Sequence, residues 1–369
     1  MLGLWTTLLQ IRAWPPTLAP HFPPPAHWQR FVQDTRRRTA ERLAAGERDH
    51  LAFFVLQSRE FTSVAPVPPV PSADLTLVRT RVRDFLRYQP RTPNERFTWL
   101  RRLPSAADPE TLFAACRAAV ESTDPSRPDF YLTRGLSSDS EVESSFALQI
   151  ALATARELSS ATPSLRDVLL LGPGLDWAPR TNFRDRPPQS HQPLAVLDAL
   201  LRRRWAARGE IRLTAFDVNP RVVHFLPRLP REWMPDLRIS DPDLAAYAAS
   251  LGDQLGRRRQ GVIALDPWVR AAIIPHLGNI ILEPPPRDFD LAIATNVLLY
   301  FTPLERTLAF HWLRSRARPD AWFIHNDPRP EVEAEARSTG WTPRLVRRLA
   351  LRGGLEDSFS LLQPAAAPA

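Results

Sequence analysis

The last two thirds of the sequence alternate between short apolar runs and longer segments with helical spacing. Residues 168–171 are four consecutive apolar residues, and residues 210–216 and the central part of 288–301 contain similar strand-like runs. Short apolar runs bounded by turn residues are typical of strands that are buried on both faces of a sheet. Because helical segments separate these runs, this part of the chain predicts an α/β fold.

Two of the helical segments have clear start and stop signals. Residues 193–208 begin with a proline in the first turn, carry apolar residues near one face and end at Gly209. Residues 303–316 follow Thr302, and Thr302 and Glu305 have the spacing of a capping box. Both segments are therefore predicted to be helices that pack on the sheet.

The first third of the sequence is rich in proline and in helical patterns. Helices are predicted over residues 26–46, 47–61, 73–88, 93–103 and 109–121. We therefore expect three parts: a flexible proline-rich lead over 1–25, a helical accessory domain over 26–125, and an α/β domain over 126–369. The accessory domain is expected either to cover a face of the α/β domain or to bind a partner.

Small and acidic residues follow the first two apolar runs. Gly172, Pro173 and Gly174 form a tight turn with little side-chain bulk, which lets a ligand approach the backbone. Asp217 directly follows the second run, and the order is strand, glycine turn, long loop, helix, strand, acid, which apart from the long loop is that of a nucleotide-type site. Two simpler interpretations remain open, because the glycine turn can be an ordinary loop and Asp217 can cap the helix that begins after Asn219.

Further polar residues are predicted at the same edge of the sheet. Asn296 ends the third apolar run, where it either faces a ligand or satisfies backbone groups at a strand end. His191 lies in a polar loop and is a candidate base above the ligand, or else a solvated loop histidine. His325 and Asp327 follow the next strand and are candidate substrate contacts. No His, Asp and Glu set has metal-ligand spacing, so no metal site is predicted.

Composition narrows the possible functions. The 369 residues are 44% hydrophobic, which is enough for a large core, and the net charge of +8 comes entirely from arginine. The arginines are scattered, which argues against a nucleic-acid partner. The single cysteine, Cys116, permits neither an internal disulfide nor a cysteine-based zinc site and favours a reducing cytoplasm. The apolar run in residues 1–14 is too short to span a membrane.

Four motifs together carry a family resemblance. In chain order they read G-P-G-L-D, F-D-V-N-P, G-N-I-I and F-D-L-A-I-A-T-N-V-L-L-Y-F. This set resembles the ordered motifs of the class I S-adenosylmethionine-dependent methyltransferases over about residues 129–363, and the last motif is similar to a segment of the chemotaxis-receptor glutamate methyltransferases and their small-molecule relatives. The resemblance implies a doubly wound, mostly parallel, seven-stranded Rossmann-like sheet that binds S-adenosylmethionine.

The resemblance also implies roles at the methionine end of the cofactor. Gly172 and Gly174 would let the backbone approach the amino-acid part. Asp176 is a candidate to accept from the ammonium group, or else caps a turn, and Arg134 is a candidate to meet the carboxylate, or else forms a surface salt bridge. The chain departs from the family at two positions: Leu170 stands where an acid is common, and Asp176 stands where a small residue is usual.

At the nucleoside end, the resemblance implies that Asp217 accepts hydrogen bonds from the ribose hydroxyls and that Asn279 and Ile280 lie beside the adenine. Asn296 would face the sulfonium and the incoming nucleophile, so Asn296 and His191 are the catalytic candidates. The expected function is methyl transfer to an O, N or C atom of a small-molecule acceptor in the cytoplasm. Two alternatives remain open: a catalytically silent S-adenosylmethionine-binding or regulatory protein, and a nicotinamide-dependent oxidoreductase.

Overall fold

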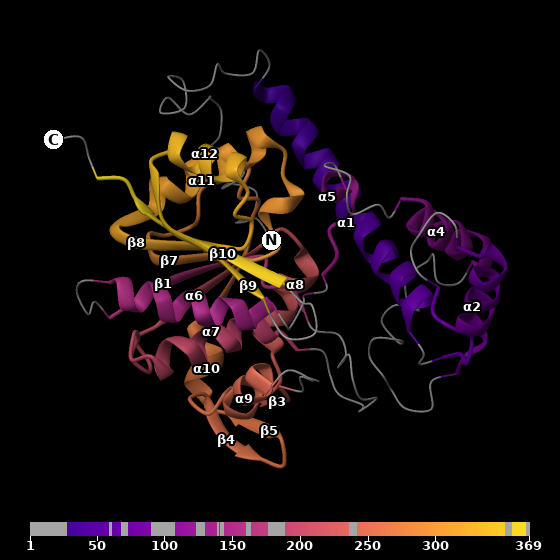
Figure 1. Cartoon of the computed structure of the whole chain (residues 1–369), viewed down its shortest axis with the longest axis horizontal. Helices are drawn as coiled ribbons and strands as arrows, with labels where there is room; N and C mark the ends of the chain where they lie inside the picture. The colour runs from indigo at the N-terminus through magenta and orange to yellow at the C-terminus, as the bar shows by residue number, and fades with distance from the viewer. Residues whose placement is uncertain are drawn as a thin grey trace.

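The computed structural model shows a twisted sheet between two layers of helices, with a further group of helices at one side (Figure 1). The structure describes residues 28–58, 61–67, 73–89, 108–122, 130–138, 140, 144–159, 164–175, 189–235, 242–350 and 356–366. Three predictions lie outside these residues: the lead over 1–25, the helix over 93–103 and the role of Asp176.

Seven strands form the main sheet. They are β1 (Asp167–Leu171), β2 (Arg212–Asp217), β6 (Ile273–Leu277), β7 (Phe289–Ala294), β8 (Ala317–His325), β9 (Trp341–Ala350) and β10 (Glu356–Pro364). Their order is β6-β2-β1-β7-β8-β10-β9, and all pairs are parallel except those of β10, which is antiparallel to β8 and β9. The predicted fold, a doubly wound, mostly parallel seven-stranded sheet, is confirmed. The strand order reverses between β1 and β7, where sheets of this kind bind ligands outside the carboxyl ends of their strands.

Helices cover both faces of this sheet. They are α6 (Ser144–Leu158), α7 (His191–Arg202), α8 (Pro220–Phe225), α10 (Pro267–Ala272), α11 (Pro303–Arg316) and α12 (Pro330–Ser338). A further helix, α9 (Pro242–Ser250), lies away from the sheet, and its Tyr247 packs against Phe146 of α6 (Figure 1). Val168 and Leu170 of β1 pack in the apolar cluster that includes α6 and α7, whereas Leu169 and Leu171 pack in the cluster that includes α11 and α12. Because successive side chains of a strand point to opposite faces, β1 is buried on both sides, as its apolar run predicts.

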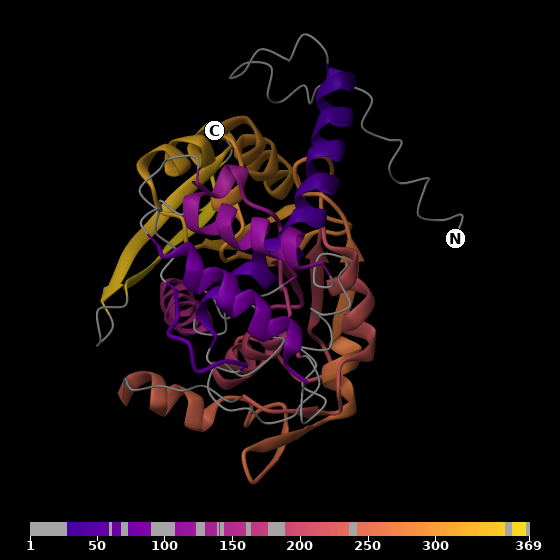
Figure 2. The same cartoon turned by 90° about the vertical axis from the view of Figure 1, so that its right-hand side faces the viewer.

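The N-terminal helices form a third apolar cluster beside the sheet. They are α1 (Trp28–Gln57), α2 (Leu75–Arg87) and α4 (Pro109–Ser122). Trp28 and Val32 at the start of α1 pack with the sheet, whereas the second half of α1, from Leu51 to Leu56, packs with α2 and α4. In Figure 2 these helices lie in front of the sheet. Helix α1 therefore connects the helical cluster to the α/β part.

The sequence predicts two helices meeting near Gly46, and this prediction is wrong, because α1 is one continuous helix. Gly46 serves a close approach instead of a break. A Cβ atom there would lie 2.2 Å from the carbonyl carbon of Leu136, and a Cβ atom on Gly135 would lie 2.4 Å from the Cα atom of Gly46. Only glycine at both positions lets α1 cross this segment backbone against backbone.

Several local predictions are confirmed and others need correction. The capping box of Thr302 and Glu305 is present at the start of α11, whose bounds agree with the prediction. Helix α7 begins at His191 and ends at Arg202, earlier than predicted. Trp233 is buried in a small sheet that the sequence did not predict. That sheet consists of β3 (Glu232–Trp233), β5 (Val262–Leu265) and β4 (Gly256–Arg259).

A network of ion pairs fixes the amino ends of the central strands. Asp167 accepts two hydrogen bonds of 2.8 Å from Arg212, one from Nε and one from Nη2, and a third of 2.8 Å from Arg318. Asp290 pairs with Arg318 and accepts from the backbone N–H groups of Arg166 and Asp167 at 2.8 and 2.9 Å. The network joins β1, β2, β7 and β8 at the edge opposite the ligand-binding edge, so it has a role in stability.

The variant Asp167→Asn is expected to lower the free energy of unfolding by about 2–3 kcal/mol at neutral pH. Burial raises the pKa of Asp167, but the hydrogen bonds and charges of Arg212 and Arg318 outweigh it, so the pKa is lowered overall. Because the pKa of Asp167 is lower in the folded state, its carboxylate stabilises the protein at pH values above the unfolded-state pKa of about 4. This stabilisation is lost as the pH falls through the folded-state pKa.

Urea denaturation measures this effect against Asp288→Asn, whose side chain is 58% exposed in its pair with Arg316. That control is expected to change the free energy by less than about 0.5 kcal/mol. Equal effects of the two variants would show that the network does not stabilise the sheet.

Candidate cofactor site

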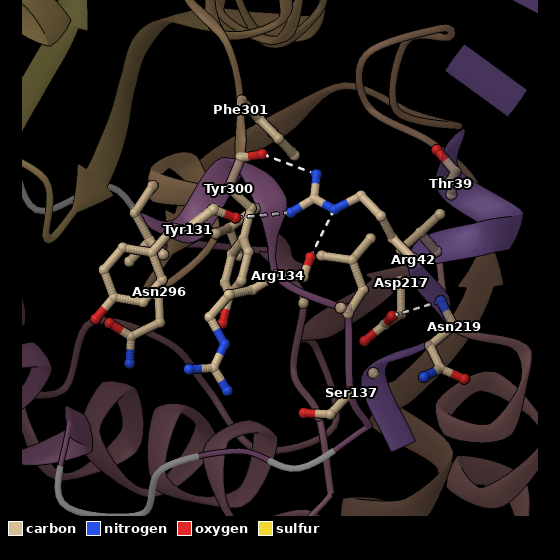
Figure 3. A pocket seen from close by; sticks show the side chains of 18 of the residues that line it. Thr39, Arg42, Tyr131, Arg134, Ser137, Asp217, Asn219, Asn296, Tyr300 and Phe301 are labelled. Carbon is tan, nitrogen blue, oxygen red and sulfur yellow. Dashed lines mark hydrogen bonds between the residues drawn. The ribbon is translucent and has the colours of Figure 1, made fainter. Parts of the chain in front are cut away.

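A cavity of about 940 Å³ lies at the carboxyl ends of β1, β2, β6 and β7 (Figure 3). The residues after these strands line one side of it, and helix α1 lines the other. Its volume is within the range of small-molecule sites. The predicted site residues that line the cavity are Arg134, Gly172, Gly174, Asp217, Asn279, Ile280 and Asn296.

The glycine turn after β1 has the backbone geometry that glycine allows. Gly172 and Gly174 have φ angles of +61° and +60°, which other residues rarely adopt. A Cβ atom on Gly174 would lie 2.5 Å from the Cβ atom of Ser140. Leu175 N donates to Ser138 O at 2.7 Å, and Ser140 N donates to Leu175 O at 2.9 Å. The turn thus borders the cavity and lies directly against the segment that follows Arg134.

Asp217 ends β2 and is only 6% exposed. Its Oδ1 atom accepts a hydrogen bond of 2.7 Å from Asn219 N, and burial raises the pKa of Asp217 to about 6. The cap of α8 is Asn219, whose side chain accepts from Arg221 N at 3.0 Å. Asp217 is therefore a buried carboxylate at the cavity wall, and a carboxylate can accept more hydrogen bonds than the backbone supplies here.

The buried charge of Asp217 is expected to reduce the stability of the protein. Since its pKa of about 6 in the folded state lies above the unfolded value of about 4, the free energy of unfolding falls as the pH rises between these values. Asp217→Asn removes this loss and is expected to raise the free energy of unfolding at pH 7.5 by up to about 3 kcal/mol. Denaturation at two pH values tests this; a gain at about pH 4 as large as that at pH 7.5 would contradict it.

Asn279 and Ile280 follow β6 and form a tight turn under α1. Asn279 Oδ1 accepts from Ile281 N at 3.0 Å, and Asn279 Nδ2 donates to Thr39 Oγ1 of α1 at 3.2 Å. Asn279 N donates to Glu283 Oε1 at 3.0 Å, and burial raises the pKa of Glu283. Ile280 is buried in the apolar cluster of α11. Asn279 therefore joins the cavity floor to α1 through its side chain.

Asn296 adopts an unusual backbone conformation after β7. Its φ angle is +56°, a left-handed value that asparagine tolerates better than most residues. Asn326, which follows β8, holds it there: Asn326 Oδ1 accepts from Asn296 N, and Asn326 Nδ2 donates to Asn296 Oδ1, both at 2.8 Å. The Asn296 amide is thus fixed at the cavity wall by a neighbour that sequence analysis did not select.

Arg134 lies between α1 and the glycine turn. Its guanidinium lies over the ring of Phe53, 4.3 Å from the ring centre, in a cation–π contact. Its carbonyl oxygen accepts from Arg42 Nε at 2.8 Å. The side chain and the backbone of Arg134 are therefore both fixed by α1.

Arg42 of α1 binds two segments of the cavity wall, one at residues 131–134 and one at Tyr300, as Figure 3 shows. Its guanidinium donates to the carbonyl oxygens of Tyr131, Arg134 and Tyr300 at 3.0, 2.8 and 3.0 Å. Tyr131 is in α5 (Phe130–Thr133), and Tyr300 is in η5 (Leu298–Tyr300). Burial lowers the pKa of Arg42.

Further contacts tie α1 to the same walls. Glu47 Oε1 accepts from Ser138 N and Oγ at 3.0 and 2.7 Å, and Glu47 Oε2 pairs with Arg221 at 3.2 Å. Asp49 accepts from Gly135 N at 3.0 Å, and Arg38 pairs with Glu305 at 3.0 Å.

The α1 residues that line the cavity share one face of the helix, and sequence analysis missed them. They are Thr35, Arg38, Thr39, Arg42, Gly46, Asp49, His50, Phe53, Phe54 and Gln57. From Thr35 to Gln57 they recur at three- and four-residue intervals, which is the spacing of a single helical face. In the sequence these residues form a mostly polar stripe along the predicted helix, but a stripe of this kind is equally typical of a helix face that is exposed to solvent.

Three other candidates lie elsewhere. His191 is the first residue of α7; it is buried against Trp233, with ring centres 5.3 Å apart, and is not among the cavity-lining residues. His325 is fully buried beneath the sheet edge, where burial lowers its pKa to about 4. Asp327 pairs with Arg329. None of these three lines the cavity.

Within the ranges that the structure describes, no cluster of three or more His, Cys, Asp and Glu side chains could hold a metal ion. Over the same residues, no helix has the length and apolar character needed to cross a membrane.

No protein-family profile and no curated protein sequence matches this chain. Solved structures do match. The chain is similar to the N-methyltransferase NodS from Bradyrhizobium japonicum, with 12% identity, a TM-score of 0.34, and coverage of 61% of this chain and 98% of that one. It is similar to a TehB-like SAM-dependent methyltransferase from Corynebacterium glutamicum, with 11% identity, a TM-score of 0.33 and coverage of 61% and 98%.

A third similarity is to magnesium protoporphyrin IX methyltransferase (ChlM) from Synechocystis, solved with bound SAM, with 10% identity, a TM-score of 0.33 and coverage of 60% and 79%. The strand order of the sheet, together with the glycine turn after β1 and the acid after β2, confirms the class I methyltransferase fold that the sequence motifs imply.

Proposed function

We propose that this chain binds S-adenosylmethionine in the cavity and transfers its methyl group to a small-molecule acceptor. The observation that carries the proposal is Asp217, a buried carboxylate at the end of β2 that lines the same cavity as the glycine turn of β1. A buried charge needs hydrogen-bond donors, and the two ribose hydroxyls of the cofactor are donors of the right kind. The residues present therefore fit the group.

The other predicted residues have consistent places in this proposal. Gly172 and Gly174 leave room for the amino-acid part of the cofactor, and the Arg134 guanidinium would bind its carboxylate. Ile280 would contact the adenine, while Asn279 would act mainly by joining that wall to Thr39. Asn296, held by Asn326, would face the reacting centre. Bound S-adenosylmethionine supplies a methyl group on a sulfonium; these residues position it and exclude water.

The size of the cavity and its closure by α1 favour a small acceptor. Helix α1 runs along one whole side of the cavity and is tied to the opposite walls by Arg42, Glu47 and Asp49. An acceptor that is part of a folded macromolecule would need a wider approach. A nucleic-acid acceptor is also disfavoured by the scattered distribution of the arginines.

Isothermal titration with S-adenosylhomocysteine and with NAD tests the proposal against its alternatives. Binding of S-adenosylhomocysteine alone supports it. Binding of NAD alone would favour the nicotinamide-dependent oxidoreductase, and binding of neither would sink both cofactor assignments. A protein that binds S-adenosylhomocysteine but yields no methylated product from any acceptor would be the silent or regulatory binding protein.

A further inference from the structure

A buried histidine precedes Asn326, the residue that holds Asn296. His325 ends β8, and its ring packs against those of Phe310 and Phe323, with ring centres 6.1 and 5.4 Å away. The Nδ1 atom of His325 accepts a hydrogen bond of 3.3 Å from Asp327 N. This bond spans Asn326 and closes the turn between β8 and α12, so the histidine ring fixes the backbone on both sides of Asn326.

The other ring nitrogen of His325 faces a buried carboxylate. Its Nε2 atom lies 3.6 Å from Oε1 of Glu333, a buried residue of α12. Burial lowers the pKa of His325 to about 4, so the ring is neutral at neutral pH. Because Nδ1 accepts from the backbone, the single ring proton of the neutral form is on Nε2, on the side of Glu333. The contacts of the two nitrogens therefore set both the tautomer and the orientation of the ring.

Asn326 connects this turn to the cavity. It makes two hydrogen bonds of 2.8 Å to Asn296, one to the backbone N–H group and one to the side-chain oxygen. Asn296 needs this support, because its φ angle of +56° is unfavourable for a residue with a side chain. A continuous chain of contacts therefore joins α12 to the cavity wall through the end of β8 and the turn that follows it.

We propose that His325 is a positioning residue for the methyl transfer. Its ring holds the turn at residues 325–327 so that Asn326 keeps Asn296 in its left-handed conformation, with the Asn296 amide fixed at the cavity wall. This inference rests on the proposed function, in which Asn296 faces the reacting centre. His325 lines no part of the cavity, so it acts only through Asn326, and Glu333 acts only through the histidine ring.

Amide hydrogen exchange of the full chain without ligand, measured by NMR, tests the hold on Asn296. His325→Phe keeps an aromatic ring but removes both nitrogens. Exchange at the Asn296 amide is expected to become about tenfold or more faster relative to the amides of β1, because its bond to Asn326 opens more often. His325→Asn is expected to restore slow exchange, since its Oδ1 atom can accept from Asp327 N in place of Nδ1. Phe310→Leu is the matched control: it loosens the packing around the ring, leaves the nitrogens in place and should not change this ratio.

A double-mutant cycle on the affinity for S-adenosylhomocysteine shows whether His325 acts through Asn326. His325→Phe and Asn326→Ala are each expected to raise Kd by about fivefold or more, and the double variant is expected to raise it no further than Asn326→Ala alone. A purely structural role of His325 would add its own loss to that of Asn326→Ala. If His325→Phe does not fold, Glu333→Leu takes its place in both experiments, and Glu333→Gln is the conservative variant that keeps an oxygen facing Nε2.

The failures are distinguishable. Unchanged exchange at the Asn296 amide in His325→Phe, or independent effects of the two substitutions on Kd, overturns the positioning role of His325. An unaltered chain that does not bind S-adenosylhomocysteine overturns the proposed function instead. The exchange experiment uses no ligand, so that second failure does not affect its result.

Discussion

Replacing Asp217 with alanine is expected to abolish measurable binding of S-adenosylhomocysteine. Asp217 is buried at the cavity wall, and its carboxylate can accept hydrogen bonds from the ribose hydroxyls in addition to those from the backbone of Asn219, Gly174 and Val218. A hydrogen bond to a charged group contributes about 1.5–3 kcal/mol, so losing two weakens binding by about a hundredfold or more. Calorimetric titration measures the loss directly.

Asp167→Asn is the matched control, because Asp167 is a buried carboxylate at the opposite end of the adjacent strand β1. Asp167→Asn is expected to lower the free energy of unfolding and to leave the affinity for S-adenosylhomocysteine unchanged. Replacing Asp217 is expected to weaken binding without lowering the free energy of unfolding. Undiminished affinity in Asp217→Ala would show that the ribose contact is wrongly assigned.

Replacing Arg42 with methionine is expected to weaken binding of S-adenosylhomocysteine by about tenfold or more, although Arg42 is not assigned a contact with the cofactor. The substitution removes three hydrogen bonds to the carbonyl oxygens of Tyr131, Arg134 and Tyr300. At about 1 kcal/mol each, their loss also lowers the free energy of unfolding by about 3 kcal/mol. Without them, the segment that carries Arg134 is no longer held against the glycine turn.

Titration calorimetry and urea denaturation measure the two effects together, with Arg48→Met as the control. Arg48 is exposed on the same helix and lines no part of the cavity. Binding in Arg42→Met equal to that of the control would show that α1 is only a cover and does not position the site.

The sequence predicted the elements whose signals are local. The run at 168–171, bounded by turn residues, predicted a strand buried on both faces. The capping box of Thr302 and Glu305 predicted where α11 begins. The β10–β9 hairpin was not predicted from a pattern of its own, because most of the side chains of β9 are exposed or half-buried and an edge strand needs no apolar run. Gly46 was misread as a helix end, since a close approach of two backbones leaves no trace in one segment alone.

In the candidate site, too, the residues with local sequence signals were predicted, and those whose position depends on distant contacts were not. Gly172, Gly174, Asp217 and Asn296 could be chosen from the sequence because each directly follows a strand, and parallel strands bring their carboxyl ends to one edge. The polar face of α1 could not be chosen from the sequence. Its position against the carboxyl edge of the sheet depends on contacts such as those of Arg42, which join residues 89 to 258 positions apart in the chain. The N-terminal helix, predicted as part of an accessory domain, contributes a wall of the cavity.

A crystal structure of the chain with S-adenosylhomocysteine is the most direct test of the central claim. It is expected to show both ribose hydroxyls within hydrogen-bond distance of the Asp217 carboxylate, the amino-acid part beside Gly172 and Gly174, and α1 closing the cavity. A ligand bound elsewhere, or one in this cavity with its ribose away from Asp217, would contradict the proposed cofactor site.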